Sequence, residues 1–255
     1  MARVERLTVY PVKGLDGVAV EEASVLPGGT LEHDREYALL DADGGVINGK
    51  RTDRVHDLST RYDPAAGVLT VAADGDRRRF DLDAERERAA AWFSGFFGAD
   101  LRLARDGSLG HVDRRNAGPS VISTATVETV ASWFDGITPD GMRRRLRANV
   151  EVGGVPAFWE DRFVGADAPA FEAGGVRFEG VEPCGRCVVP TRDPDTGAAV
   201  PGFRERFVER RRGTFPEWAD RDAFDHLYAV MLIARIPEAD RGATLATGDG
   251  VRVVD

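Results

Sequence analysis

Short apolar runs separated by turn residues fill the first third of the chain, which is the pattern of β-strands. Four such runs lie at 4–10, 18–20, 23–26 and 37–40. The cluster 41–45, rich in Asp and Gly, is a turn signal after the last of them. A second hairpin is indicated where residues 62–67 break the chain before the run at 68–71, and residues 72–76 close that strand. The N-terminal third is therefore predicted to be mostly sheet.

The hydrophobic period changes to that of an α-helix over residues 83–97. Apolar side chains recur there at helical spacing, with Asp83 as the predicted N-cap and Gly98 as the predicted end of the helix. The segment carries four aromatic residues, Trp92, Phe93, Phe96 and Phe97. We expect these rings to pack in the core rather than to contact a cofactor, because such a helix must bury its apolar face against the sheet.

The polar, glycine-containing segment 105–116 is the candidate boundary between two parts of the chain. After it, a helix is predicted over 125–134, with Thr124 as its N-cap and Gly136 at its end. Strand-like runs then recur at 149–152, 171, 176–178, 187–189, 228–233 and 251–254. Short strands interrupted by Gly and Pro favour a β-barrel with a few helices over alternating βα units.

The predicted fold class is therefore α+β and β-rich, in two parts. An N-terminal sheet domain is predicted over residues 1–106, and a C-terminal β-barrel with a few helices over residues 107–255. A hydrophobic content of 42% with 30% charged residues is ordinary for a globular protein, and a chain of 255 residues can hold one large domain or two smaller ones.

The net charge of −9 argues against a general nucleic-acid-binding protein. Arginine-rich runs occur at 77–79, 143–147 and 210–212, and we interpret each as a solvated face, because exposure is the usual state of arginine. The apolar run at 228–234 is far too short to span a bilayer, and the N-terminus lacks a signal-peptide pattern. We therefore expect a cytoplasmic protein that binds neither nucleic acid nor membrane.

Arginine supplies nearly all of the positive charge, since the chain has two lysines, Lys13 and Lys50, among 34 basic residues. An ammonium group is a compact point charge, whereas a guanidinium group is a planar fork. A lysine that is kept where arginine is otherwise used is a candidate for a shape-dependent role, and chance is the equal alternative.

The two cysteines lie together in Cys184-Gly185-Arg186-Cys187, which concentrates all thiolate chemistry in one turn. Thiolates are ligands for soft or redox-active metals, and a neighbouring cation such as Arg186 favours the thiolate. A structural zinc site would need four ligands, and the four histidines, His33, His56, His111 and His226, are not at zinc-finger spacing. An iron–sulfur cluster lacks its four thiolates, and c-type haem lacks a histidine after the second cysteine, where Val188 stands.

Two simpler interpretations of the cysteine pair remain open. A thioredoxin-like dithiol would have to begin a helix, whereas the residues after Cys187 suggest an extended segment that ends in Pro190. Alternatively, both thiols are buried structural groups, because free cysteine often behaves as a small apolar core residue.

The ordered set of motifs resembles the MOSC domain proteins, named for the C-terminal domain of molybdenum cofactor sulfurase, and within them the mitochondrial amidoxime reducing component and its bacterial relatives. The motifs are Val9-Tyr10-Pro11-Val12-Lys13-Gly14, Asp34-Arg35, Asn149 shortly after an arginine, Cys184-Gly-Arg-Cys187 with Asp193-Pro-Asp-Thr-Gly197, and Gly248-Asp249-Gly250-Val251. The resemblance covers nearly the whole chain. It implies a molybdopterin held between the two domains, with molybdenum bound through Cys187, and pyridoxal phosphate is not expected.

The resemblance also implies which residues hold this molybdenum cofactor. Lys13 and Arg35 would meet the phosphate and the pterin, and Arg147 with Asn149 would act from the opposite wall, with Arg186 and Tyr228 nearby. No role is implied for Cys184, which we expect to pack beneath the loop without forming a disulfide.

The chain departs from the family pattern at three places. Gly14 replaces a frequent serine, and the segment 146–149 lacks the usual proline. Asn116-Ala117-Gly118-Pro119 stands where hydroxyl residues are common, so that a phosphate contact there would come from Asn116 or from backbone N–H groups such as that of Gly118. The cofactor tail, or the way in which it is held, is therefore expected to differ.

The implied activity is the two-electron reduction of N-hydroxylated small molecules such as amidoximes and hydroxylamines. The composition offers no second redox centre, so a separate electron donor is expected: a ferredoxin, a flavoprotein reductase or a cytochrome. Asp195 and His226 are the candidate proton donors. The alternative is a molybdenum cofactor carrier or a sulfur-transfer module that uses Cys187.

Overall fold

The computed structural model describes residues 1–255. The strands are β1 (Arg3–Val9), β2 (Val18–Val20), β3 (Glu22–Ser24), β4 (Tyr37–Leu40), β5 (Ser59–Asp63), β6 (Val68–Ala73), β7 (Asp76–Asp81), β8 (Arg102–Arg105), β9 (Ser120–Ser123), β10 (Val150–Gly153), β11 (Ala170–Ala173), β12 (Val176–Gly185), β13 (Ala229–Arg235), β14 (Thr244–Ala246) and β15 (Val251–Val254). The helices are α1 (Arg86–Phe97), α2 (Thr124–Ser132), α3 (Pro139–Leu146) and α4 (Phe203–Gly213). Short 3₁₀ helices are η1 (Asp53–Asp57), η2 (Trp159–Phe163), η3 (Val189–Thr191), η4 (Arg221–Ala223) and η5 (Glu238–Asp240).

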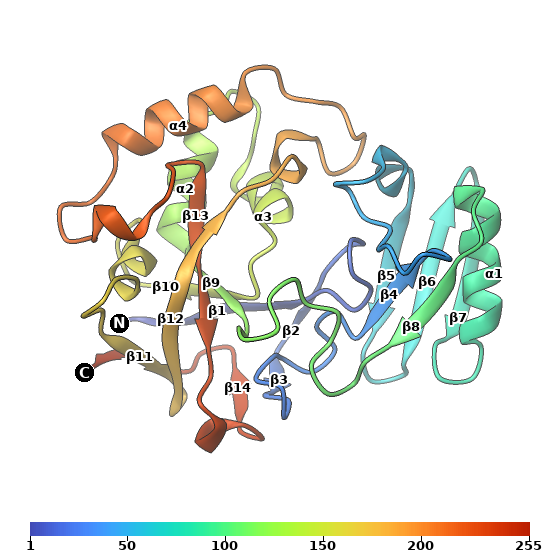
Figure 1. The fold of residues 1–255 in the computed structure, drawn as a ribbon, viewed down its shortest axis with the longest axis horizontal. Helices are drawn as coiled ribbons and strands as arrows, with labels where there is room; N and C mark the ends of the chain where they lie inside the picture. Colours follow the sequence, from blue (N-terminus) through green and yellow to red (C-terminus); the bar gives the residue numbers. More distant parts are fainter.

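The largest element is an eight-stranded mixed sheet with the order β15-β11-β12-β13-β9-β10-β1-β2 (Figure 1). Its pairs are antiparallel except for β10 with β9, which run parallel. Strands β1 and β2 come from the N-terminal end of the chain, and β1 pairs antiparallel with β10, Leu7 opposite Val150. The sheet therefore extends across the predicted boundary at residue 106, and the division into 1–106 and 107–255 stays a prediction.

A second body, on the right of Figure 1, contains β4 paired with β8, the three-stranded sheet β5-β6-β7, and helix α1. The expected hairpin is present, because β5 and β6 pair antiparallel with Asp63 opposite Val68. The four aromatic residues of α1 pack in the core as predicted: Phe93 is fully buried, and the others pack against the same cluster.

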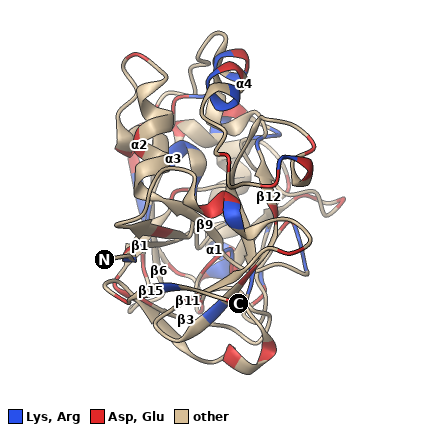
Figure 2. Cartoon of the chain, turned by 90° about the vertical axis from the view of Figure 1, so that its left-hand side faces the viewer, with Lys and Arg blue, Asp and Glu red and all other residues tan.

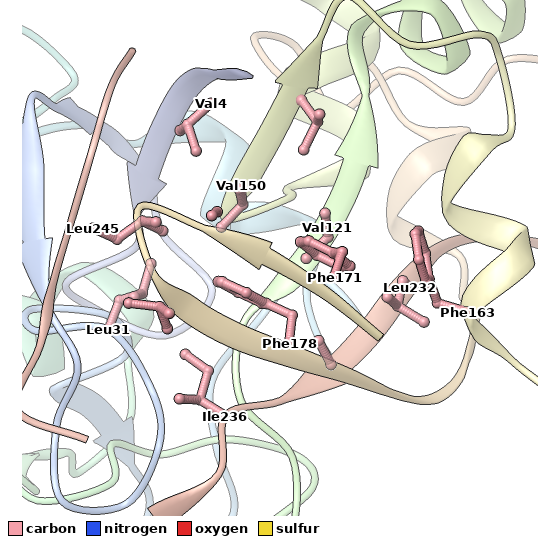
Figure 3. Close-up of a cluster of buried hydrophobic side chains, with 14 of the residues drawn as sticks. Val4, Leu31, Val121, Val150, Phe163, Phe171, Phe178, Leu232, Ile236 and Leu245 are labelled. Atoms are coloured by element: carbon pink, nitrogen blue, oxygen red, sulfur yellow. The ribbon is translucent and has the colours of Figure 1, made fainter. Parts of the chain in front are cut away.

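Apolar side chains of the large sheet alternate between two cores. Val121 of β9 faces the cluster shown in Figure 3, with Phe171 and Phe178, whereas the next residue, Ile122, faces the core under α2, α3 and α4. In strand β13, Leu232 packs in the first core, and its neighbours Met231 and Ile233 pack in the second. Because helices and loops cover both faces, β13 can be apolar at nearly every position, which explains the apolar run at its centre.

The N-cap residues predicted for helices α1 and α2 are wrong by two residues and one residue, respectively. Helix α1 has Glu85 rather than Asp83 at its N-cap, with no side-chain capping bond, although it ends at Gly98 in the left-handed conformation as predicted. Helix α2 is capped by Ser123, whose hydroxyl accepts the N–H of Thr126, whereas Thr124 is the first helical residue. Helix α2 also ends at Trp133, three residues before Gly136.

Two helices were not predicted, and both contain arginine-rich runs that were interpreted as solvated faces. Helix α3 begins at Thr138 and Pro139, and its Arg145 is buried. Helix α4 buries Phe203, Phe207 and Arg211, which recur every four residues on one face. The third of these buried positions is charged, so the apolar stripe is incomplete in the sequence. Arg211 is fully buried, and two contacts compensate its charge: an ion pair with Asp161, and the ring of Phe158, whose centroid lies 4.2 Å from the guanidinium.

The prediction of a strand at 187–189 is wrong. Strand β12 ends at Gly185, and the chain then turns into the 3₁₀ helix η3. Cys187 therefore lies in the loop between these elements rather than in the sheet. The other C-terminal strands lie within a few residues of their predicted positions, and the α+β, β-rich class is confirmed. None of the helices combines the length and the apolar character needed to cross a membrane.

Glu160 is a buried carboxyl group beside the start of α2. One of its oxygens accepts the backbone N–H of Ser123 and the hydroxyl of Thr126, at 3.2 and 3.1 Å, whereas the other is buried without a partner. Burial, together with the nearby Asp161 carboxylate, raises the pKa of Glu160 to about 8. The folded protein therefore holds Glu160 protonated at neutral pH.

Replacing Glu160 with Gln is expected to stabilise the protein increasingly as the pH rises from about 5 to about 8. In this window the folded wild type keeps a proton that the unfolded chain has lost, so its stability falls with rising pH, whereas glutamine has no proton to lose. Thermal unfolding of both proteins across the window measures the effect, with the exposed Glu209→Gln on α4 as the control. A melting difference between Glu160→Gln and wild type that does not change with pH would contradict this assignment.

Candidate functional site

A cavity of about 1030 Å³ lies between the second body and the helical side of the large sheet, and most of the predicted site residues line it. They are Lys13, Gly14, Arg35, Gly118, Arg147, Asn149, Arg186 and Cys187. Asn116 and Tyr228 do not line it. Residues that are more than 170 positions apart, such as Lys13 and Cys187, are therefore brought to one cavity by the fold.

Cys187 lies half-buried in the loop that follows β12, and it is a free thiol. No hydrogen bond to its sulfur is found, but its carbonyl oxygen accepts the hydroxyl of Tyr228 at 3.2 Å. Burial raises the pKa of Tyr228 to about 12, which keeps this hydroxyl protonated as a donor. Tyr228 thus fixes the backbone of Cys187 from behind the cavity wall.

Arg186 joins the cysteine loop to the end of α3. Its guanidinium donates to the Cys184 sulfur at 3.0 Å and to the Leu146 carbonyl at 2.9 Å, and its Nε is buried without a partner. Cys184 is a free, buried thiol that packs among the core residues under the helices. Both cysteines border the cavity, but Cys184 is buried and accepts the Arg186 hydrogen bond, whereas Cys187 is half-buried.

Tyr10, directly after β1, organises two arginines that line the cavity. The Arg147 guanidinium lies 4.0 Å from its ring centroid and the Arg35 guanidinium 5.4 Å, and both are cation–π distances. Burial raises the pKa of Tyr10 to about 12, and its hydroxyl donates to the Ala148 carbonyl at 3.3 Å. A neutral, fixed ring thus supports two guanidinium groups at the cavity.

Arg147 ends helix α3 in the left-handed conformation, at φ 62°. One nitrogen of its fork donates to the Leu15 carbonyl at 2.7 Å, which crosses from α3 to the N-terminal segment. Burial lowers the pKa of the Arg147 guanidinium, and no carboxylate forms an ion pair with it. A partly buried cation without an ion-pair partner is suited to bind an anionic ligand.

The side chain of Asn149 is used mainly to hold the sheet together. Its Oδ1 accepts the N–H and the hydroxyl of Ser120, and its Nδ2 donates to the Thr8 carbonyl at 3.1 Å. Arg35 reaches the same Oδ1 at 3.5 Å and pairs with Asp34. Asn149 therefore positions Arg35 and three strands while it lines the cavity.

The segment 116–119 offers little to a ligand. Asn116 is exposed and lies off the cavity wall. Gly118 lines the wall, but its N–H already donates to the Ala234 carbonyl at 2.6 Å. A Cβ at Gly118 would lie 2.4 Å from the Gly29 carbonyl oxygen, so glycine is required for the close approach of these two chain segments.

Positive charge dominates the cavity wall although the protein is acidic. Eleven basic residues line it against four acidic ones: Arg6, Lys13, Arg35, Lys50, Arg114, Arg143, Arg144, Arg145, Arg147, Arg186 and Arg192 against Asp16, Asp113, Asp140 and Glu151. The basic residues of α3 contribute to this wall, and they are among the blue segments of Figure 2. Such a concentration of positive charge attracts an anionic ligand.

Neither proton donor expected from the sequence has suitable surroundings. Asp195 is held by Arg144 through two bonds of 2.8 and 2.6 Å, which hold the pKa of its carboxyl group below the usual value. His226 lies in a shallow groove beside α4, outside the cavity. His56, in η1, is the histidine on the cavity wall that remains a candidate, and its Nε2 is buried without a hydrogen-bond partner.

Four residues of the site were missed as site residues at the level of sequence: Tyr10, Lys50, His56 and Asp113. Tyr10 was visible as part of a motif, and Lys50 as one of two lysines. Nothing in the sequence pattern pointed to Asp113 in its polar loop. Clusters of three or more His, Cys, Asp or Glu side chains able to hold a metal are absent, so a metal at Cys187 would take most of its ligands from a cofactor.

Comparison with known proteins gives matches along most of the chain. Mitochondrial amidoxime reducing component 2 of Macaca fascicularis is 27% identical over 233 residues, which cover 76% of this chain and 68% of that protein. The Homo sapiens protein of the same name is also 27% identical, and that of Bos taurus 25%. Among solved structures, the YUAD protein from Bacillus subtilis covers 99% of this chain and 94% of its own at 13% identity and a TM-score of 0.45, which is too low a likeness to bear on the fold.

Family matches divide the chain into two adjoining regions. Residues 1–100 match the MOSC N-terminal beta barrel domain, and residues 117–251 match the MOSC domain. Both regions contribute walls to the cavity, with Lys13 and Arg35 from the first and Arg147 and Cys187 from the second. The chain belongs to the MOSC domain family.

Proposed function

We propose that the protein is a molybdenum-cofactor enzyme that reduces N-hydroxylated small molecules, with Cys187 as the metal ligand. The observation that carries the proposal is a half-buried thiol, free of hydrogen bonds, on the wall of a cavity lined by eleven basic side chains. The name of the matched relatives, amidoxime reducing component, supports the class of substrate.

The residues of the cavity fit an anionic cofactor that brings soft ligands. A free thiol is suited to molybdenum, and the absence of other clustered ligands fits a metal whose remaining sulfurs come from a pterin. The unpaired Arg147 and the buried Nε of Arg186 are cationic groups without a carboxylate partner. When bound, the molybdenum centre supplies the two electrons that break the N–O bond.

The chain's own residues then have three tasks. Cys187 would hold the metal, and the hydrogen bond from the Tyr228 hydroxyl to its carbonyl fixes the backbone that carries the thiol. Arg35 and Arg147, supported by Tyr10, would hold the anionic part of the cofactor. The conversion of N–OH to N–H and water consumes two electrons and two protons. We assign proton supply to the His56 imidazole, which lines the cavity, because the alternatives Asp195 and His226 are paired or outside the cavity.

The source of the electrons is the second part of the proposal. The chain has two cysteines, one of which is in the core, and no group of side chains that could hold a second metal centre. We therefore propose a separate ferredoxin, flavoprotein reductase or cytochrome as the donor. A chemical reductant can replace this donor in a first assay.

Replacing Cys187 with Ser is expected to remove molybdenum from the protein and to lower benzamidoxime reduction by about 100-fold or more, because a hydroxyl is a poor ligand for a soft metal. Protein from a molybdenum-competent host would be analysed for metal content and then assayed with a chemical reductant. Cys184→Ser is the matched control, since it makes the same chemical change at the other thiol, which is buried and already accepts a hydrogen bond from Arg186.

Three outcomes of this experiment decide between the functions. Loss of molybdenum and of benzamidoxime reduction in Cys187→Ser, but not in Cys184→Ser, supports the enzyme. Equal loss with both variants, or none with Cys187→Ser, contradicts the assignment of the ligand. Wild-type protein that holds the cofactor but shows no turnover would instead identify a cofactor carrier or a sulfur-transfer module.

Replacing Arg147 with Lys is expected to speed the loss of bound cofactor by about tenfold, because lysine keeps the charge but not the planar fork that stacks on Tyr10. Both residues would adopt the same left-handed backbone, so strain does not differ greatly between them. Pterin fluorescence after gel filtration measures retention, and Arg206→Lys on the exposed face of α4 is the control. Equal retention by the Arg147 and Arg206 variants would show that the stacked guanidinium is not a cofactor contact.

Replacing His56 with Gln is expected to lower the turnover number by about 100-fold, the usual effect of removing a proton donor, without changing the molybdenum content. The two quantities are measured on the same preparation. A parallel loss of metal and of turnover would assign His56 a structural role instead, as would unchanged turnover.

A further inference from the structure

Both lysines of the chain converge on a single carboxylate at the cavity. Lys13 Nζ lies 2.5 Å from one oxygen of Asp113, and Lys50 Nζ lies 3.0 Å from the other. The three residues lie in separate loops, and the Lys13 and Asp113 positions are 100 residues apart. The Lys13 side chain is 13% exposed, whereas those of Lys50 and Asp113 are each 51% exposed.

The two loops that carry the lysines are packed closely against each other at Gly14 and Asn48. Gly14 has φ 90°, and a Cβ there would lie 2.9 Å from the Cβ of Asn48. A larger residue at position 14 would therefore not fit against Asn48. Lys50 belongs to the same turn as Asn48, since its backbone N–H donates to Asn48 Oδ1 at 3.0 Å.

Asp113 belongs to a segment whose two ends form backbone hydrogen bonds to other parts of the chain, whereas its middle is held by side-chain ion pairs. At one end the His111 N–H donates to the Arg35 carbonyl at 2.7 Å, and at the other the Gly118 N–H donates to the Ala234 carbonyl. Between them, residues 112–116 form ion pairs through Asp113 and through Arg114 to Glu182, but their backbone makes no hydrogen bond to another part of the chain. We call residues 112–116 the strap.

We propose that Lys13 and Lys50 together form the subsite for the phosphate of the cofactor, and that Asp113 occupies this subsite as an internal anion until the phosphate displaces it. The inference rests on the proposed cofactor site, and it adds Lys50 and the strap to the residues that act there. Asp113 competes with the phosphate for both lysines.

The exchange is favourable for electrostatic reasons. Although burial alone would raise it, hydrogen bonds from the two lysines hold the pKa of the Asp113 carboxyl group well below its usual range, so Asp113 is fully charged at any working pH. It nevertheless carries one negative charge, whereas a phosphate monoester carries nearly two and has three acceptor oxygens. Half-exposed ion pairs stabilise a structure only weakly, so the strap can be released at small cost.

The test uses cofactor-free protein and inorganic phosphate, followed by titration calorimetry at constant ionic strength. Asp113→Asn is expected to bind phosphate about three- to tenfold more tightly than wild type, because the competing carboxylate is gone. Adding Lys50→Gln to Asp113→Asn is expected to remove this gain. Asp43→Asn, at an exposed aspartate without an ion pair, makes the same change in net charge and is the matched control.

Cleavage by trypsin provides a second measurement, because Arg114 and Arg115 lie in the strap. Phosphate is expected to speed cleavage at these residues in wild type, since it releases the strap, whereas Asp113→Asn is expected to be cleaved rapidly with or without phosphate. Lys13→Gln should abolish the response of the wild type.

Three results would overturn the inference. One is unchanged or weaker phosphate binding by Asp113→Asn, another is a gain equal to that of Asp43→Asn, and the third is phosphate that protects the wild-type strap from cleavage. Because no molybdenum is involved, a failure here leaves the role of Cys187 open, and a failure of Cys187→Ser leaves the phosphate subsite open.

Discussion

Antiparallel pairing of β1 with β10 brings the N-terminal segment against the C-terminal sheet, with Leu7 opposite Val150. Tyr10 follows β1 directly, and Arg147 lies shortly before β10, so the register of this pair sets the 4.0 Å stacking distance between them. The hydrogen bonds of Asn149 to Thr8 and to Ser120 fix the same register from within the sheet. A shift of one residue would turn these side chains to the other face of the sheet and would separate the two walls of the cavity.

A positively charged cavity inside an acidic protein requires that most of its cations be compensated. Helix α3 shows how this is done: Arg143 pairs with Glu151, Arg144 with Asp195, and Arg145 with Asp193. The arginine at the end of the helix, Arg147, is left without such a partner and is instead held by an aromatic ring and a carbonyl group. The paired residues support the wall, while the unpaired one keeps its charge available for a ligand.

Sequence patterns predicted the elements whose stability depends on local periodicity. The hairpin of β5 and β6, the helix with Phe93, and strand β13 all have apolar positions at the spacing of their secondary structure. Helix α4 was missed because Arg211 stands in the third position of its buried stripe, where an apolar residue would be expected. The rings of Phe158 and Phe215 and the carboxylate of Asp161 surround its guanidinium and make its burial favourable.

The cysteine loop and the lysine cluster show a different limit of sequence-based prediction. The resemblance identified Cys187, yet the segment after it was expected to be extended and is instead a 3₁₀ turn, since Pro190 and the Tyr228 contact bend the chain there. Asp113 and Lys50 are 63 residues apart in polar loops, and a contact of this kind leaves no periodic trace. The motif therefore pointed to a residue that does line the cavity, Cys187, whereas contacts between loops needed the fold.

The rarity of lysine has a practical consequence for work with this protein. Besides the N-terminus, Lys13 and Lys50 carry the two primary amines of the chain, and both lie at the cavity, with Lys50 the more accessible. Acylating reagents will therefore attach dyes, biotin or a sensor surface at the cavity. An immobilisation chemistry that is harmless for most proteins would obstruct this one, so coupling through an added tag is the safer choice.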